Sequence, residues 1–178
     1  MKIEQLLHVL RAAADISGEK SFVIVGSQAV LLMLQEPDAR LVMSDEIDLY
    51  PSAAPEKSEL IDGAIGALSL FHDTHGYHAD GVSPEIAVMP PDWMSRASFQ
   101  YFGDLTVISP DLHDLCVSKC VAGRDKDADF VRVLLRDGHA LIDILKERIV
   151  LIDASKHNIP SVIAWAERRW RETQEAKS

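Results

Sequence analysis

The sequence predicts an α/β fold in which a small mixed sheet is flanked by helices and followed by a helical C-terminal half. Short apolar runs bounded by Gly and Pro alternate with stretches of helical periodicity up to about residue 109. Beyond that point only helical periodicity is found, with breaks at Gly123, at Asp137-Gly138 and before Pro160. We therefore expect an α/β core over residues 1–109 and about four helices over 110–178, packed on the core as one unit.

The elements of the core follow one another along the chain. A helix is predicted from residue 3 to Ser17-Gly18, and a strand over 21–25 is followed, after Gly26-Ser27, by a helix to about Gln35. The further expected elements are a strand over about 41–50 that ends at Pro51, a helix over about 60–71, and strands over 77–89 and 98–108. Ser83-Pro84 offers a break within the strand over 77–89. Ser109-Pro110-Asp111 is typical of a helix start, because proline and an acid both suit the first turn.

Composition and charge limit the class of protein. The 178 residues, 47% of them apolar, suffice for one domain with a real core. No apolar run approaches the roughly 20 residues of a membrane helix, and the start lacks a signal-peptide core, so we expect a cytoplasmic protein without a membrane partner. A net charge of −10 argues against broad nucleic-acid binding. Cys116 and Cys120 match no zinc pattern and are expected to be reduced packing residues.

Gly26-Ser27 stands where the first strand turns into the next helix. Glycine lets a ligand approach the backbone closely, and the N–H groups of a helix start together with the Ser27 hydroxyl suit a phosphate group. The alternative is a plain helix cap, which is the commoner use of such a turn.

The second predicted strand carries two acids in alternation. Side chains two residues apart in a strand share a face, so Glu46 and Asp48 point together while Asp45 and Ile47 point the other way. Two carboxylates this close repel each other unless water or a cation lies between them, and oxygen ligands suit Mg²⁺. The alternative is an edge strand with a solvated acidic face.

A mixed-charge stretch follows in the helical half, Lys119-Cys120-Val121-Ala122-Gly123-Arg124-Asp125-Lys126-Asp127-Ala128-Asp129. If the helix continues through Gly123, Lys119 and Lys126 share one face that could receive a triphosphate. A charged surface helix with ordinary pairs four residues apart is the alternative.

These stretches together resemble the nucleotidyltransferase superfamily typified by DNA polymerase beta. Gly26-Ser27 followed by Glu46-Ile47-Asp48 resembles its Gly-Ser and acid-x-acid motifs. VGSQAVL, EIDLYP, YHADGVSPE, PPDW and KCVAGRDKD are similar to segments of small bacterial nucleotidyltransferase-like proteins related to AbiEii toxins. The resemblance spans about residues 20 to 135 and implies a sheet of nucleotidyltransferase type.

The resemblance also implies roles for individual residues. Gly26 and Ser27 would hold nucleotide phosphate, and Glu46 and Asp48 would bind Mg²⁺ or Mn²⁺ together with a third carboxylate. Asp80 matches that third position best, and Glu85 is the next candidate. The nucleotide contacts of the helical half would be Lys119, Arg124 and Lys126, and Asp127 and Asp129 match further polar positions of the motif.

The reaction implied is transfer of NMP from an NTP to a hydroxyl of tRNA or of a protein, in the toxin of a toxin–antitoxin system with an antitoxin protein as partner. Arginines on the last helices, Arg132, Arg136, Arg168, Arg169 and Arg171, would suit RNA but equally a solvated helix face. Glu46 stands where the family usually has Asp, which favours a second reading as a catalytically degenerate binding or complex-forming module. A metal-dependent nuclease is the third reading.

Three histidines form a separate pattern. His72, His75 and His78 are spaced by three, as in some metal-binding tracts, but no Cys or second His cluster accompanies them, so the tract favours no metal site by itself. The sequence contains no GxSxG, GxxxxGK[ST] or HExxH pattern, which removes support for hydrolase, P-loop and zincin functions.

Overall fold

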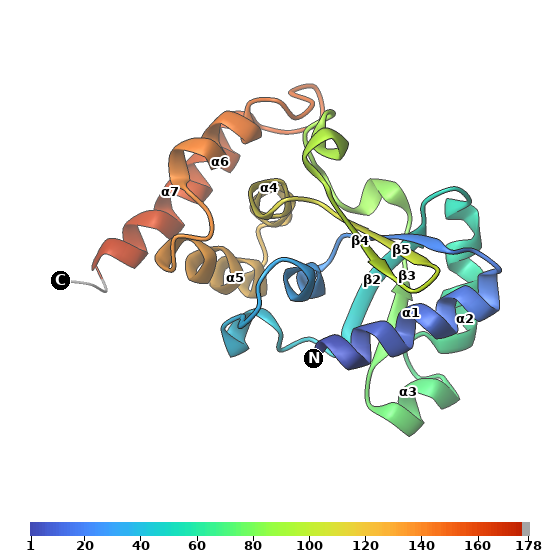
Figure 1. The fold of residues 1–178 in the computed structure, drawn as a ribbon. Helices are drawn as coiled ribbons and strands as arrows, with labels where there is room; N and C mark the ends of the chain where they lie inside the picture. The colour runs from blue at the N-terminus through green and yellow to red at the C-terminus, as the bar shows by residue number, and fades with distance from the viewer. Residues whose placement is uncertain (176–178) are drawn as a thin grey trace. The chain divides into compact units, whose positions relative to one another are not determined.

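The computed structural model describes residues 1–175 and divides the chain into two compact units (Figure 1). Unit 1 consists of Met1–Ala87 and Ala97–Pro110 and contains the sheet. Unit 2 consists of Val88–Arg96 and the chain from Asp111 onward, and its main elements are helices. Among the described residues, no helix is both long and apolar enough to cross a bilayer.

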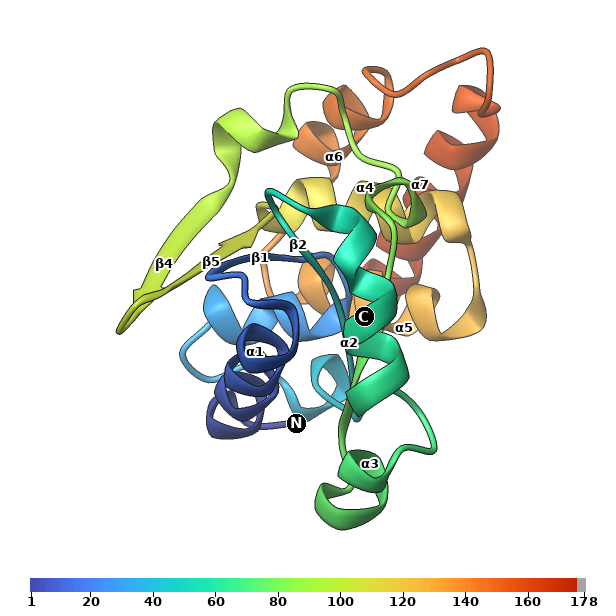
Figure 2. The ribbon, with the colours of Figure 1, turned by 90° about the vertical axis from the view of Figure 1, so that its right-hand side faces the viewer.

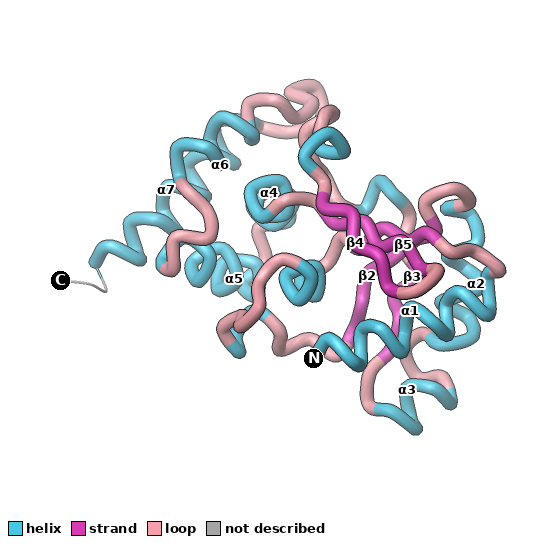
Figure 3. The backbone as a smooth tube through the Cα atoms, in the orientation of Figure 1, coloured by secondary structure: helices cyan, strands magenta, loops and turns pink. Residues whose placement is uncertain are grey.

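The sheet of unit 1 is mixed, as predicted, and has five strands in the order β3-β2-β1-β5-β4 (Figure 3). The strands are β1 (Ser21–Ile24), β2 (Glu46–Pro51), β3 (His78–Gly81), β4 (Ser98–Phe102) and β5 (Leu105–Ser109). β2 and β3 are parallel, as are β1 and β5, whereas β1 pairs antiparallel with β2 and β4 with β5. The parallel β2–β3 pair carries the acids singled out in the sequence.

Helices of unit 1 cover one side of this sheet. α1 (Ile3–Ser17) and α2 (Ser58–Ile65) pack on each other and on β2 and β3, and α3 (Leu70–His75) precedes β3 (Figure 2). α1 ends as predicted, at Gly18 with a φ of 71°. The core between helices and sheet is formed by fully buried apolar residues, among them Leu6, Leu10, Phe22, Ile24, Ile47, Leu49 and Ile61.

The helix expected to run from Ser27 to Gln35 is not an α-helix. The segment forms a short 3-10 helix, η1 (Ser27–Leu32), and a second one, η2 (Ala39–Leu41), precedes β2. Over six residues an apolar pattern does not distinguish a 3-10 helix from an α-helix, because buried positions three apart fit both periods. β2 itself begins at Glu46, five residues later than the sequence indicated.

Two other expected elements are split in the structure. The helix expected over 60–71 is divided into α2 and α3, since Gly66 ends α2 in an extended conformation. Leu60 and Leu68, two of the residues that gave this stretch its apolar periodicity, are 57% and 88% exposed. The strand expected over 98–108 is the β4–β5 hairpin, whose turn contains Gly103 at a φ of 66°. Of the strand expected over 77–89, only β3 forms.

Unit 2 contains the four predicted helices. They are α4 (Leu112–Ala122), α5 (Asp125–Arg136), α6 (Ile142–Ile149) and α7 (Ile159–Glu175). α4 begins after Pro110, because Asp111 is its cap and accepts a hydrogen bond from the Asp114 amide at 2.8 Å. The remaining 3-10 turns are η3 (Pro55–Lys57) and η4 (Pro84–Ile86) in unit 1 and η5 (Trp93–Arg96) in unit 2.

A buried carboxylate joins the segment before β4 to the helices of unit 2. Asp114 is fully buried and accepts hydrogen bonds from Arg96 Nε at 2.9 Å and from Arg148 Nη1 at 3.0 Å. Two guanidinium partners satisfy a carboxylate that burial alone would destabilise. Asp114 therefore ties residues 88–96, through Arg96, and α6, through Arg148, to α4.

Candidate functional site

The turn after β1 lies directly against the second acid of β2. Ile24 pairs with Leu49, and the Val25 amide donates a 3.0 Å hydrogen bond to the Asp48 carbonyl. This pairing brings Gly26 so close to Asp48 that a Cβ on Gly26 would lie 1.7 Å from Asp48 Oδ2. Because Gly26 has an extended backbone with a φ of −84°, the close approach, and not the conformation, requires glycine here.

Three half-buried carboxylates share one face of the β2–β3 pair. Glu46 and Asp48 are two residues apart in β2, so their side chains project from the same face. Asp80 of β3 is in register with Asp48, so its side chain projects from that face on a strand about 4.8 Å away. Ile47, between the two β2 acids, is fully buried on the other side. A set of carboxylate oxygens fits a hard divalent cation such as Mg²⁺ or Mn²⁺.

Gln28 is a residue of this region that the sequence interpretation missed. It is fully buried, and its Nε2 donates a 2.9 Å hydrogen bond to the Ser44 carbonyl, two residues before β2. Its Oε1 has no hydrogen-bond partner among the described residues. Gln28 thus ties the turn at Gly26-Ser27 to the entry of the acidic strand. The feature of the sequence that could have pointed to Gln28 is its amide side chain within an otherwise apolar run.

Glu85, the second candidate for the third carboxylate, lies elsewhere along this edge of the sheet. It is exposed in η4, past the end of β3. Burial, with a smaller contribution from the charge of Glu85, raises the pKa of Tyr50. The register of Asp80 with Asp48 makes Asp80 the better geometrical partner of the β2 acids.

Lys119 and Asp127 form a buried polar pair in unit 2. Asp127 is 1% exposed and Lys119 is 9% exposed, with Lys119 Nζ 3.7 Å from Asp127 Oδ1. The amide and Nε of Arg124 donate to Asp127 at 3.2 and 2.7 Å, which caps α5. These contacts give Lys119, Arg124 and Asp127 a structural role in joining α4 to α5.

The single helix on which Lys119 and Lys126 would share a face does not form, because the chain breaks at Gly123 as predicted. Gly123, with a φ of 63°, ends α4, so Lys119 belongs to α4 and Lys126 to α5. The reason is that glycine at the end of a helix adopts the left-handed conformation readily, and Arg124 can then start a new helix. Lys126 is exposed in the first turn of α5, and Asp129, also exposed, pairs with Arg132.

The arginines considered for RNA binding share acidic partners. Arg132 and Arg169 both contact Glu172, at 2.7 and 3.1 Å, and Arg168 Nε lies 3.3 Å from the same carboxylate. Arg169 is 8% exposed and its guanidinium lies over the Trp165 ring. These contacts use part of the positive charge of α5 and α7 within unit 2 itself.

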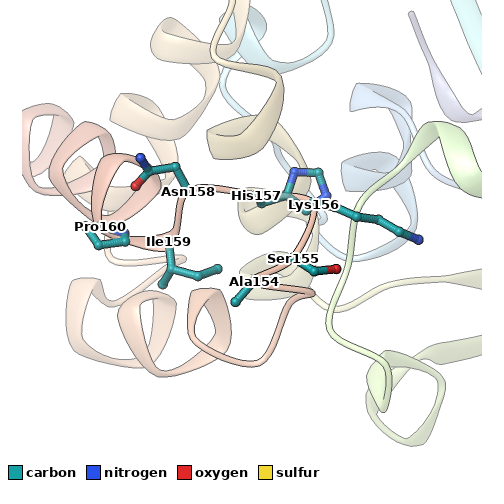
Figure 4. Close-up of a pocket in the computed structure, with 7 residues that line it drawn as sticks. All are labelled: Ala154, Ser155, Lys156, His157, Asn158, Ile159 and Pro160. Atoms are coloured by element: carbon teal, nitrogen blue, oxygen red, sulfur yellow. The ribbon is translucent and has the colours of Figure 1, made fainter.

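A pocket in unit 2 contains none of the predicted site residues. It is lined by the consecutive residues 154–160, which form the loop before α7 and the first two positions of that helix (Figure 4). Its side chains come from consecutive positions, without carboxylates. It therefore has no part in the acidic face described above.

A Gly-Ser turn held against an acid-x-acid strand in a mixed sheet indicates a protein of the nucleotidyltransferase class. The model of one family, described as "Nucleotidyltransferase of unknown function (DUF6036)", matches residues 2–176. The chain belongs to this family. Neither a curated protein nor a solved structure matched the chain.

Proposed function

We propose that the protein is a metal-dependent nucleotidyltransferase that moves NMP from an NTP to an acceptor hydroxyl. The observation that carries the proposal is the register of Asp48 with Asp80, with Glu46 on the same face and Gly26 leaving room for the Asp48 carboxylate. Membership of a nucleotidyltransferase family supports the class of reaction.

The acids are proposed as the metal ligands of this reaction. Glu46, Asp48 and Asp80 offer only oxygen atoms, which are the ligands that Mg²⁺ and Mn²⁺ take in proteins. Bound ions of this kind would neutralise charge on the triphosphate and on the leaving pyrophosphate. The Ser27 hydroxyl and the backbone N–H groups after Gly26 are proposed to bind a phosphate group. Of the basic residues, exposed Lys126 is the proposed triphosphate contact, with Lys119 and Arg124 in support.

In the proposed reaction, the acceptor oxygen forms a bond to the α-phosphorus of the NTP. The bond from that phosphorus to the oxygen bridging to the β-phosphate breaks, and pyrophosphate leaves with that oxygen. The acceptor hydroxyl loses its proton, and Asp80 is the proposed base. The products are the nucleotidylated acceptor and pyrophosphate, so atoms and charge balance without a further reactant.

The acceptor is proposed to be tRNA or a protein hydroxyl, as the resemblance to AbiEii-type toxins suggests. In that case the protein would act in the cytoplasm as a toxin and would bind an antitoxin protein. The net charge of −10 favours an acceptor that is contacted locally over one bound along an extended basic surface. The pairing of Arg132, Arg168 and Arg169 with Glu172 supports the same preference.

A binding or complex-forming module without catalysis is the second candidate. Two observations favour it: Glu46 stands where the superfamily motif usually has Asp, and Lys119 is engaged with buried Asp127. Glu is one methylene longer than Asp, so it holds a cation at a different depth over the sheet. A nuclease that uses the same acids is the third candidate. It ranks last because it would leave Gly26-Ser27 and Lys126 without a role in binding phosphate.

Calorimetric titration with each of the four ribonucleoside triphosphates, with and without Mg²⁺, tests the proposal. Wild type is expected to bind at least one NTP only with Mg²⁺, and Asp48→Asn to lose this binding. Asp45→Asn is the matched control, because Asp45 is exposed and precedes β2. No Mg²⁺-dependent binding, or equal loss in both variants, would overturn the proposed site.

Transfer from α-labelled NTP separates the first two candidates. A transferase moves the label to tRNA or protein and releases pyrophosphate, whereas a binding module retains nucleotide affinity with no label transferred to either acceptor. A nuclease shortens RNA in the absence of NTP, and its activity survives Ser27→Ala and Lys126→Met.

A further inference from the structure

We propose that unit 1 carries a second, chemically different metal site, formed by Asp45, His72 and His78 and suited to a transition-metal ion such as Zn²⁺. One ligand atom from each residue lies within 4.8 Å of the other two. The residues come from the position before β2, from α3 and from the first position of β3. The fold therefore assembles from distant parts of the chain a set that the spacing of the histidines did not predict.

Asp45 and His72 are spaced like two ligands of one ion. His72 Nε2 lies 3.5 Å from Asp45 Oδ2. That distance exceeds the roughly 2.8 Å of a charge-assisted hydrogen bond. It is close to the separation of about 3.3 Å between two ligands of a tetrahedral ion with bonds of about 2.0 Å. Asp45 is exposed, so its side chain is able to turn toward the histidines.

The burial of His78 points to a metal ion at this site independently of the spacing of Asp45 and His72. Its side chain is 7% exposed, and its Nδ1 has no hydrogen-bond partner among the residues that the structure describes. A buried polar atom without a partner is rare in native proteins and costs free energy. The His78 ring lies 4.3 Å from the His72 ring, centroid to centroid, so the two imidazoles of the triad are direct neighbours. Ligation of an ion would give this buried ring the polar partner that it lacks.

The donor set selects the kind of metal. Two imidazole nitrogens and one carboxylate oxygen suit Zn²⁺, Co²⁺ or Ni²⁺, whereas Mg²⁺ takes oxygen ligands. Three protein ligands leave a fourth position for water. The site thus differs in chemistry from the all-oxygen face of Glu46, Asp48 and Asp80.

Binding requires one local rearrangement. His72 Nδ1 accepts a 3.1 Å hydrogen bond from the Leu68 amide, so a neutral ring carries its proton on Nε2. A metal bound at Nε2 moves that proton to Nδ1, and the contact with Leu68 is given up. Leu68 is 88% exposed at a φ of 63°, so the loop between α2 and α3 loses only a surface contact.

His75 provides a matched control on the same helix. Its ring contacts those of His8 and Phe71, each at 4.7 Å between centroids, and it is outside the triad. The His78 backbone is in register with Glu46, so an ion on the triad would tie α3 to the strand pair that carries the acids. We therefore expect a bound ion to stabilise unit 1.

Titration of the full chain with Co²⁺, followed by visible absorption, and with Zn²⁺, followed by thermal unfolding, tests the site. We expect one Co²⁺ per chain with d–d bands, and a rise in Tm of roughly 5 °C at a Zn²⁺ excess of about 100 times Kd. His72→Gln and Asp45→Asn, both at positions that are not buried, are expected to lose at least about tenfold in affinity, as direct ligands should. His75→Gln and Asp48→Asn are expected to bind as wild type does.

The variants make the outcome decisive even if a change at buried His78 prevents folding. Absence of binding by wild type would overturn the proposal, as would unchanged affinity in His72→Gln and Asp45→Asn. Loss of binding in Asp48→Asn but not in His72→Gln would assign the ion to the acidic face instead. Because Mg²⁺-dependent NTP binding is measured separately, this site and the proposed function can fail independently.

Discussion

The Asp48 carboxylate occupies the space in which a side chain at Gly26 would begin. A Cβ at Gly26 would stand 1.7 Å from Asp48 Oδ2 and 2.6 Å from Asp48 Cγ. The antiparallel pairing of β1 with β2 fixes this approach, and the Val25 amide on the Asp48 carbonyl continues it past the end of β1. The turn that is proposed to bind phosphate and the acid that is proposed to bind metal are therefore set against each other by the backbone.

Gly26→Ala should disturb this acid more than it disturbs the fold. The added methyl group must push the Asp48 side chain away, so we expect Mg²⁺-dependent NTP binding to weaken at least about tenfold. Overpacking of this kind should lower the free energy of unfolding by about 1–3 kcal/mol. Calorimetry and urea unfolding measure the two effects.

Gly63→Ala is the control for Gly26→Ala. Gly63 lies on the exposed face of α2 and has nothing within 4 Å of an added Cβ, so alanine there should stabilise the helix by about 0.5–1 kcal/mol. Nucleotide binding should not change. Equal NTP affinity in both alanine variants would contradict the proposed role of the Gly26–Asp48 contact.

Asp80 and Glu85 should differ sharply in their importance. Asp80 is in register with Asp48, whereas exposed Glu85 lies near Tyr50. We expect Asp80→Asn to reduce nucleotidyl transfer at least about a hundredfold, because it removes a proposed metal ligand and base. The rate of nucleotidyl transfer by Glu85→Gln should stay within about twofold of the wild-type rate. Steady-state rates of pyrophosphate release test the pair, and the reverse ranking would show that the third carboxylate was assigned incorrectly.

The two lysines of the helical half should separate stability from binding. Lys119 is nearly buried beside Asp127, so Lys119→Met should lower the free energy of unfolding by about 2–3 kcal/mol. At exposed Lys126, the change to methionine should alter the free energy of unfolding by no more than about 0.5 kcal/mol. If Lys126 contacts the triphosphate, Lys126→Met should nevertheless weaken NTP binding. Unfolding curves together with calorimetry distinguish these effects, and NTP affinity equal to that of wild type would remove Lys126 from the site.

The cysteines should be unreactive in the folded chain. Both thiols are free and buried, and burial raises the pKa of Cys120 from 9.0 to about 12 and that of Cys116 in the same direction. At pH 8, a thiol reagent should therefore label neither cysteine of the native protein within minutes. After unfolding, two equivalents of the reagent should react per chain. Rapid labelling of the native chain would contradict this packing.

The same raised pKa fixes the sign of a pH effect on stability. The thiol of Cys120 holds its proton more tightly when folded, so its contribution to stability is complete below about pH 9 and is lost as pH rises toward 12. Cys120→Ala should reduce the loss of stability above pH 9. An identical alkaline profile in this variant would assign the loss to other groups.

Long periodic elements could be predicted from the sequence, and short ones could not. α1 and the helices α5 to α7 follow apolar periodicity, and Gly18 is a clear stop signal of α1. α4 is recognised by its ends, the cap at Asp111 and the stop at Gly123. The segment after Gly26 was misassigned because a six-residue 3-10 helix has the same apolar pattern as an α-helix. The break between α2 and α3 was not predicted because exposed Leu68 falls on the helical spacing of a continuous core face.

The acidic face could be predicted from the sequence because alternation along a strand determines which side chains project together. Glu46 and Asp48 needed only that rule, whereas the position of Asp80 beside Asp48 depends on the register of β3. Contacts between distant segments gave no sequence signal. The hydrogen bond from Gln28 to Ser44, and the convergence of Asp45 with His72 and His78, exist only because the fold brings these segments together.

Counting bound Mn²⁺ by electron paramagnetic resonance, in the presence of a non-hydrolysable NTP analogue, tests the central claim most directly because no acceptor is needed. The account predicts protein-bound Mn²⁺ beyond that chelated by the nucleotide in solution, lost in Asp48→Asn and in Asp80→Asn and retained in Glu85→Gln. Mn²⁺ binding that is absent in wild type, or unchanged when Asp48 is replaced, would contradict it.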